Sequence, residues 1–213
     1  GNLYIKEAFE RGASLAVVNK IDKYSNIPKQ IKVKNSLKFL TEISKILREN
    51  SKAKIIGITG SCGKTSLKEL IGKSFQKISK VTYSPKSFNN KYGVPLSLFN
   101  LKTKDNFGVF EIGMDKKGEI DILSKIIKPD LAIITNISYA HAKNFNNIKQ
   151  IALAKSEIIQ NIKDGGIIIL NSDDEFYDFH KKIAKNRNLK VFSFSMKKKN
   201  SDASLHSIKK EGK

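Results

Sequence analysis

From about residue 54 onward, short apolar runs alternate along the chain with amphipathic stretches of helical length. The runs at 55–58 and 167–170 contain no polar residue, which is typical of strands covered on both faces of a parallel sheet. The pattern predicts strands at residues 54–59, 80–83, 107–112, 131–135, 166–170 and 190–194. It predicts helices between them at residues 64–77, 118–127, 148–162 and 174–186. We therefore expect an α/β fold with a doubly wound, mostly parallel sheet.

The chain before this pattern has a different organisation. Asn35 or Ser36 can cap a helix whose leucine and isoleucine residues fall on one face. The residues before that helix are too few to bury a core alone. We therefore divide the chain into residues 1–34, the tail of a preceding domain, and residues 35–213, a second domain. After Met196 the chain is rich in Lys and Ser, which predicts a solvated loop or a strand whose partners are absent.

Length and composition exclude several classes of protein. A chain of 213 residues with 39% hydrophobic residues is apolar enough to fold, and no apolar run approaches the roughly 18 residues of a membrane span. The only cysteine, Cys62, excludes an intrachain disulfide and favours a reducing compartment. The chain begins with Gly and shows no signal peptide, so we expect a fragment of a cytoplasmic protein.

The net charge of +20 raises the possibility of nucleic-acid binding. Only Arg11, Arg48 and Arg187 are arginine among the 40 basic residues, and the lysines are spread along the whole chain. Proteins that read bases or clamp phosphates usually exploit the planar fork of arginine. The excess of lysine therefore indicates the codon preference of an AT-rich gene rather than a nucleic-acid partner. A basic nucleic-acid-binding module is kept as the alternative from a different class.

The strongest chemical signal is GITGSCGKT, from Gly57 to Thr65, where a predicted strand ends and a helix begins. Such a loop turns backbone N–H groups toward an anion, the lysine adds a positive charge, and the threonine hydroxyl can bind Mg²⁺. The spacing is a variant, because five residues separate Gly57 from Gly-Lys-Thr and two separate Gly60 from it, instead of four. The motif indicates a nucleoside triphosphate site. Its structural alternative is a tight turn that merely uses glycine.

Other polar residues follow the predicted strands directly. Glu111, Asn136, His141 and Asn171 each lie just beyond the carboxyl end of a strand. These ends share one edge of a parallel sheet, and ligands bind at that edge. Singly, each residue could be a solvated loop residue or a local cap. Together with the phosphate loop they favour a site.

The segment 84–95, SPKSFNNKYGVP, contains proline, glycine and paired asparagine residues. Proline and glycine prevent regular structure, and the asparagine side chains offer both donors and acceptors to a polar ligand. The segment predicts a binding loop. A surface turn whose asparagine doublet reflects codon preference is the alternative.

Five segments, in this order and at these separations, resemble the Mur ligase family: TGSCGKTSLKEL, SPKSFNNKYGVPLSL, FEIGMDKKGEI, TNISYAHAKNF and ALAKSEII. The resemblance extends from about Leu3 to about Ala203. The FNN-x-x-GVPL loop and the EIG-x-x-x-x-GEI segment are typical of the members that join D-alanyl-D-alanine to UDP-N-acetylmuramoyl-tripeptide. Another Mur ligase or a folylpolyglutamate-type ligase is the alternative within this class.

The resemblance implies ATP-dependent amide formation through an acyl phosphate, with Mg²⁺, in bacterial peptidoglycan precursor synthesis. The implied partners are UDP-N-acetylmuramoyl-tripeptide and D-alanyl-D-alanine, for a cytoplasmic, monomeric enzyme without a membrane or a specific nucleic-acid partner. The resemblance also implies that residues 1–34 are the end of the family's small α/β N-terminal domain, which binds the UDP substrate, and that 35–213 are its central ATP-binding domain, incomplete at its C-terminal end. The family's adenine-contacting stretch and its C-terminal domain would lie beyond Lys213. We therefore expect the chain to be inactive alone.

The resemblance also assigns roles to residues. It implies that the catalytic residues are Lys64, Glu111, His141 and Lys155. It implies that the ATP phosphates contact Thr59, Gly60, Ser61, Cys62, Gly63, Lys64, Thr65, Ser66 and Asn136. It implies that Mg²⁺ is held by Thr65, Glu111, His141 and Lys155, the last as a carbamate. It implies that the substrate contacts Ser87, Asn89 and Asn90. After His141 the acidic residue that is usual in the family is missing, which sets this turn apart from the family pattern.

Overall fold

The computed structural model describes residues 2–21, 29–139 and 144–207, and the chain divides into two compact units, residues 1–43 and 44–213. In the first unit a 3-10 turn (Asn2–Tyr4) leads into helix α1 (Ile5–Glu10), and strands β1 (Ala16–Val18) and β2 (Gln30–Lys32) pair in parallel. Among the described residues of this unit, Ile5 and Val18 are buried and apolar. The division falls within helix α2 (Ser36–Asn50), and the predicted domain boundary at residue 34 stays a prediction.

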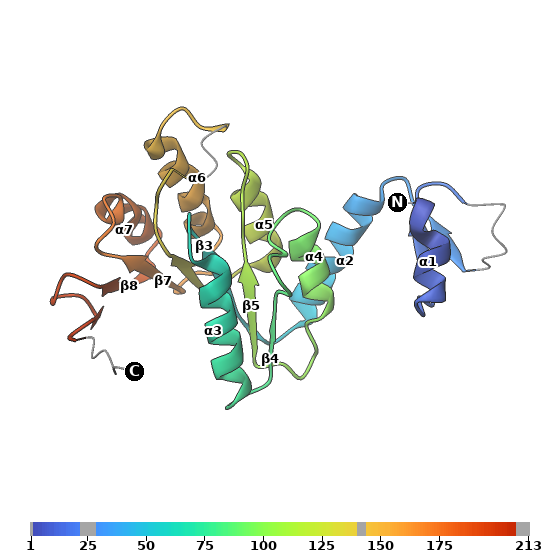
Figure 1. Cartoon of the computed structure of the whole chain (residues 1–213), viewed down its shortest axis with the longest axis horizontal. Helices are drawn as coiled ribbons and strands as arrows, with labels where there is room; N and C mark the ends of the chain where they lie inside the picture. Colours follow the sequence, from blue (N-terminus) through green and yellow to red (C-terminus); the bar gives the residue numbers. More distant parts are fainter. Residues whose placement is uncertain (1, 22–28, 140–143, 208–213) are drawn as a thin grey trace, which may run out of the picture. The chain divides into compact units, whose positions relative to one another are not determined.

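The second unit contains a parallel sheet with the strand order β4-β5-β3-β6-β7-β8-β9 among the described residues (Figure 1). Its strands are β3 (Lys54–Thr59), β4 (Val81–Tyr83), β5 (Phe107–Glu111), β6 (Leu131–Ile134), β7 (Ile167–Asn171), β8 (Lys190–Ser195) and β9 (Ala203–Ser204). Its helices after α2 are α3 (Lys64–Gln76), α4 (Gly93–Phe99), α5 (Glu119–Ile127), α6 (Ile148–Gln160) and α7 (Tyr177–Asn186). All strand pairs are parallel, which confirms the predicted doubly wound fold.

Apolar residues on alternate positions of the central strand β3 serve two different cores. Ile55 packs in the cluster that contains Ile127 of α5 and Ile158 of α6, whereas Ile56 and Ile58 pack in the cluster beneath α3. Ile55 and Ile58 are completely buried, and burial of such a side chain contributes about 1.5–3 kcal/mol. This two-sided burial explains why the strand sequence is a continuous apolar run rather than an alternating one.

Beyond shifts of one or two residues at element ends, the structure differs from the sequence prediction at three places. Residues 93–99 form α4, so the irregular segment ends at Tyr92 instead of Pro95. Pro95 is tolerated because the first turn of a helix needs no N–H donor there. Helix α7 begins three residues after the expected start at Asp174, whose carboxylate instead accepts hydrogen bonds from the backbone N–H groups of Ile137 and Phe176. The segment after Met196 returns as strand β9, whose partner is β8.

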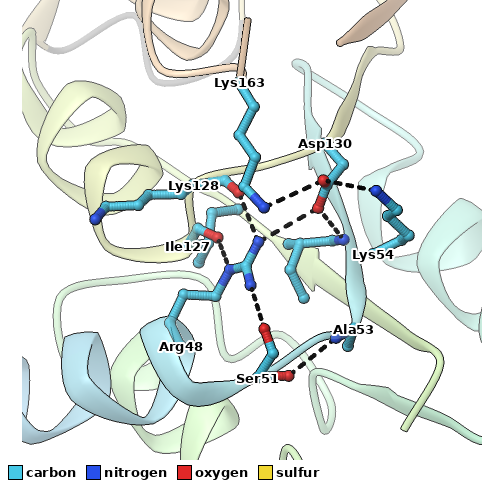
Figure 2. A network of polar contacts seen from close by, with 9 residues as sticks. Arg48, Ser51, Ala53, Lys54, Ile127, Lys128, Asp130 and Lys163 are labelled. Atoms are coloured by element: carbon cyan, nitrogen blue, oxygen red, sulfur yellow. Dashed lines mark hydrogen bonds and ion pairs between the residues drawn. The ribbon is translucent and has the colours of Figure 1, made fainter.

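The last turn of α2 is fastened to the amino-terminal edge of the sheet by a buried polar network (Figure 2). The guanidinium of Arg48 donates to the carbonyl groups of Ile127 at 2.6 Å and Lys128 at 3.0 Å, where α5 ends. It also contacts the carboxylate of Asp130, which accepts the Ile55 backbone N–H at 2.8 Å. Arg48 thus satisfies carbonyl groups that the end of a helix leaves without partners.

No helix within the described parts of the chain combines the length and the apolar composition needed to cross a membrane.

Candidate active site

The loop between β3 and α3 depends on two glycine residues. Gly63 precedes α3 with a φ of 80°, and Gly60 has a φ of 144°, both in the region that favours glycine. A Cβ atom on Gly60 would lie 1.9 Å from Oγ1 of Thr135. The backbone therefore passes directly over the end of β6, and the loop conformation requires glycine at this point.

The residues that follow β6 form hydrogen bonds with this loop. Thr135 Oγ1 donates to the carbonyl of Cys62 at 2.6 Å, and Asn136 Oδ1 accepts the Cys62 N–H at 2.9 Å. The Asn136 carbonyl accepts the N–H of Ser61 at 2.9 Å. Ser138 and Ser61 exchange two further hydrogen bonds, of 2.8 and 3.0 Å. Asn136 thus orients the loop, and a direct contact between Asn136 and a phosphate stays a prediction.

Two lysine side chains converge on the carbonyl oxygen of Gly60. Lys64 Nζ donates to it at 2.8 Å, and Lys155 Nζ, from helix α6, donates at 3.0 Å. Lys155 is only 2% exposed. Burial, together with the charge of Lys64, lowers the pKa of Lys155 to about 7, although Cys62 acts in the opposite direction. Close to neutral pH a substantial fraction of Lys155 is therefore an uncharged amine.

A buried carboxylate lies at the end of the neighbouring strand β5. Glu111 is 1% exposed, and its Oε2 accepts a hydrogen bond of 2.7 Å from Oγ1 of Thr65 in the first turn of α3. Its Oε1 accepts a hydrogen bond of 2.7 Å from Nδ2 of Asn89. Ser87 Oγ lies 3.4 Å from Oγ1 of Thr65. Residues predicted from three separate motifs therefore meet at one point.

The close approach of Asn89 to Glu111 depends on Gly113, the second residue after β5. A Cβ atom on Gly113 would lie 2.8 Å from Cγ of Asn89, and the Gly113 N–H donates to the Asn89 carbonyl at 2.8 Å. A side chain at position 113 would therefore push Asn89 away from Glu111. Asn90 has a different local role, because its Oδ1 accepts the N–H groups of Tyr92 and Gly93 at the start of α4.

A cavity of about 470 Å³ opens beside Lys64 and the asparagine residues. Met114 and Leu123 are the buried apolar residues of its lining, and Lys91 and Lys116 are exposed. The cavity combines apolar walls with cationic, acidic and amide side chains. Such a lining suits a ligand that carries both aliphatic parts and charged groups.

Other predicted residues are placed less informatively. His141 lies outside the described residues. Ser66 is exposed in the first turn of α3, and Cys62 is exposed just before this helix. Thr59 is buried at the end of β3. Asn171 donates to the carbonyl of Thr135 at 3.3 Å. In the ranges that the structure describes, no group of three or more His, Cys, Asp or Glu residues is arranged to hold a metal ion.

Sequence reasoning missed three residues that shape this site. Thr135 and Ser138 support the phosphate loop, and the only local signal was their position next to Asn136, after an apolar strand. Lys68 is completely buried one helical turn after Lys64. Nothing in the sequence separates it from the other lysine residues, because its environment is created by a segment that follows much later in the chain.

A comparison with known protein families covers the residues of this site. The family model of the Mur ligase middle domain matches residues 58–213. The chain belongs to the Mur ligase family. The match includes the phosphate loop, Glu111 and Lys155, so the site described above lies inside the Mur ligase domain. The predicted resemblance is thereby confirmed.

Individual Mur ligases resemble the chain over most of its length. The UDP-N-acetylmuramoyl-tripeptide–D-alanyl-D-alanine ligase of Rickettsia prowazekii (strain Madrid E) is 38% identical over 195 residues, which are 91% of this chain and 43% of that protein. The crystal structure of MurF from Acinetobacter baumannii superimposes with a TM-score of 0.84 at 30% identity, over 97% of this chain and 44% of that one. MurF ligase from Thermotoga maritima, in complex with ADP, superimposes with a TM-score of 0.79 at 28% identity, over 97% and 46%. The chain thus spans less than half of these Mur ligases.

Proposed function

We propose that this chain supplies the ATP-binding and phosphoryl-transfer part of a ligase that joins D-alanyl-D-alanine to UDP-N-acetylmuramoyl-tripeptide. The observation that carries the proposal is the meeting of Thr65, Glu111 and Asn89 beside a glycine-dependent loop at the start of α3. The names of the relatives support the choice of substrates. Residues 1–34 would belong to the N-terminal domain of that enzyme and the remainder to its central domain, in the bacterial cytoplasm.

In the proposed reaction, a carboxylate oxygen of the tripeptide attacks the γ-phosphorus of ATP, and ADP leaves. The amine of D-alanyl-D-alanine then attacks the acyl phosphate, loses a proton and expels inorganic phosphate, which leaves an amide. The protein must bring two anions together and stabilise the charge that develops during transfer. Lys64 and the N–H groups at the start of α3 are placed to contact the phosphates. The cavity beside Lys64 would receive the tripeptide.

The donor set beside the loop fits Mg²⁺. Thr65 and Glu111 offer a hydroxyl and a carboxylate oxygen, which are the hard ligands that Mg²⁺ prefers, and Mg²⁺ usually completes its shell with phosphate oxygens and water. Bound there, the ion would neutralise charge on the phosphates. Asn89 holds the second oxygen of Glu111, so that Oε2 faces Thr65. His141 stays a predicted ligand.

Lys155 has the properties that carbamate formation requires. A carbamate forms when the lone pair of a neutral amine attacks CO₂ and the nitrogen loses a proton. The lowered pKa of Lys155, caused by burial and by Lys64, provides the neutral amine at a pH near 7. The product would convert a buried cation into an anionic oxygen ligand near the phosphate loop.

Calorimetric titration of the full-length product of the gene with ADP tests the nucleotide site. We expect binding that strengthens with Mg²⁺ and is lost in Lys64→Ala, whereas Lys91→Ala, which removes an exposed lysine of the neighbouring cavity, retains it. If wild type binds ADP and Lys64→Ala binds it equally well, the assignment of Lys64 to the nucleotide site would be contradicted.

The substrates are tested in the full-length product of the gene. We expect phosphate release with ATP and UDP-N-acetylmuramoyl-tripeptide only when D-alanyl-D-alanine is added. Release with a single amino acid instead would favour another Mur ligase or a folylpolyglutamate-type ligase.

A further inference from the structure

Lys68 lies on α3 one turn after Lys64 and is completely buried. Its Nζ donates to the carbonyl of Ser84 at 2.8 Å and to the carbonyl of Lys86 at 2.7 Å. A third bond of 2.7 Å goes to Oε1 of Glu69. An ammonium group has three donors, so all of them are used within the protein. Lys68 therefore has no donor left for a phosphate, although it follows the phosphate-binding lysine on the same side of the helix.

The two carbonyl groups belong to the segment that leads into the site. Ser84 also accepts the backbone N–H of Glu111 on its Oγ at 3.1 Å. Lys86 immediately precedes Ser87, and it has a φ of 47°, a conformation that residues other than glycine rarely adopt. Lys68 thus binds this segment at a point next to Glu111 and at a strained residue next to Ser87.

We propose that Lys68 is a positioning residue, which holds segment 84–89 so that Ser87 and Asn89 face Thr65 and Glu111. The role of the site rests on the proposed function, but the positioning itself can be tested without it. Two of the three acceptors are backbone carbonyl groups of an irregular segment, and Glu69 is partly exposed, with a side chain that is 33% accessible. Loss of the ammonium group should therefore release the segment rather than the helix.

Two amide groups report on the segment. The N–H of Phe88 donates to the carbonyl of Pro85 at 3.1 Å, and the N–H of Gly113 donates to the carbonyl of Asn89 at 2.8 Å. Both bonds exist only while the segment keeps its conformation. The N–H groups of Ile112 and Thr135, which donate to β3 at 2.8 and 3.0 Å, report on the sheet beside it. Their exchange rates separate local release from general destabilisation.

The experiment measures amide hydrogen exchange by NMR in the 213-residue chain for wild type, Lys68→Met and Lys73→Met. Lys73 is a matched control because it lies on the same helix and pairs with the same Glu69 at 3.8 Å, but its side chain is 69% exposed. In Lys68→Met we expect exchange at Phe88 and Gly113 to be at least tenfold faster, with Ile112 and Thr135 unchanged. Lys73→Met should match wild type at all four amides.

Unchanged exchange at Phe88 and Gly113, or an equal increase at all four amides, would overturn the proposal. If Lys68→Met does not fold, Lys68→Gln replaces the ammonium group with a shorter, uncharged amide. It should also accelerate exchange at Phe88 and Gly113 alone, because it weakens the bonds to the carbonyl groups of Ser84 and Lys86, and an unchanged or uniform profile would again refute the role. A titration of the full-length product of the gene with ADP and Mg²⁺ separates the two hypotheses. Absence of binding in that wild-type protein contradicts the proposed function, while the exchange rates decide the role of Lys68 independently.

Discussion

Replacing Arg48 with methionine removes a buried guanidinium and keeps most of the volume of the side chain. Arg48 is 3% exposed and donates to the carbonyl groups of Ile127 at 2.6 Å, Lys128 at 3.0 Å and Ser51 at 3.3 Å. It also lies 3.3 Å from the carboxylate of Asp130. The substitution therefore removes the donor from the end of α5 and the partner from an ion pair in one step (Figure 2).

The loss of unfolding free energy depends on which hydrogen bonds and ion pairs the former partners of Arg48 keep. Removing one member of a buried ion pair costs about 3–5 kcal/mol, mainly because the other charge is left alone. Here Asp130 keeps the N–H of Ile55 at 2.8 Å and Lys163 at 3.2 Å, which places the cost at the lower end. Each buried carbonyl that loses its donor adds about 1–3 kcal/mol, although these costs are not additive. We expect the free energy of unfolding to fall by about 3 kcal/mol.

Urea unfolding, followed by far-UV circular dichroism because the chain has no tryptophan, measures this change. With a typical dependence on urea, the midpoint should shift by roughly 1–2 M. Arg48→Lys should be intermediate, since a point charge cannot reach both carbonyl groups and Asp130. Glu49→Ala is the control, because Glu49 pairs with Lys128 at the surface of the same region, and its midpoint should match wild type. An Arg48→Met midpoint no lower than that of Glu49→Ala would refute the reasoning.

Three further predictions concern the site and the pH dependence. Gly60→Ala should weaken ADP binding at least tenfold in calorimetry, because its Cβ would collide with Thr135, and equal affinity would contradict the loop geometry. Lys155 should give a carbamate signal in ¹³C NMR under ¹³CO₂ that grows as the pH rises through about 7, because deprotonation supplies the reactive amine, and the signal should be absent in Lys155→Arg. Its presence in that variant would assign it to another group. His180 contacts the carbonyl of Ala152, and burial lowers its pKa. Below a pH of about 6.5, His180 is therefore protonated more fully in the unfolded chain than in the folded chain, which favours unfolding. Stability measured by urea should therefore fall with acid in wild type and less steeply in His180→Gln, and parallel profiles would exclude His180 as the cause.

Several parts of the fold could be predicted because their causes are local. The central strands β3, β6 and β7 lie where apolar runs predicted them, since burial on both faces leaves few polar positions. The phosphate loop was visible because Gly60 and Gly63 adopt conformations that favour glycine. Helix α4 was missed because Pro95 is usually a signal of irregular structure. In addition, the side chain of Asn90, which accepts the N–H of Gly93 at the start of α4, was interpreted as a ligand-binding group.

The sequence by itself determined the alternation of strands and helices from residue 54 onward, apart from α4 and β9, together with the phosphate loop and the family to which the chain belongs. Only the tertiary structure decided how these parts meet. The strand order β4-β5-β3-β6 brings Glu111 and Asn89 to Thr65, although they are separated from it by other elements of the chain. Among the lysine residues that the structure describes, burial and three acceptors single out Lys68, and burial beside Lys64 singles out Lys155. The physical reason is that periodicity and turn preferences act between neighbours in the chain, whereas desolvation and hydrogen-bond partners are set by residues that only folding brings together.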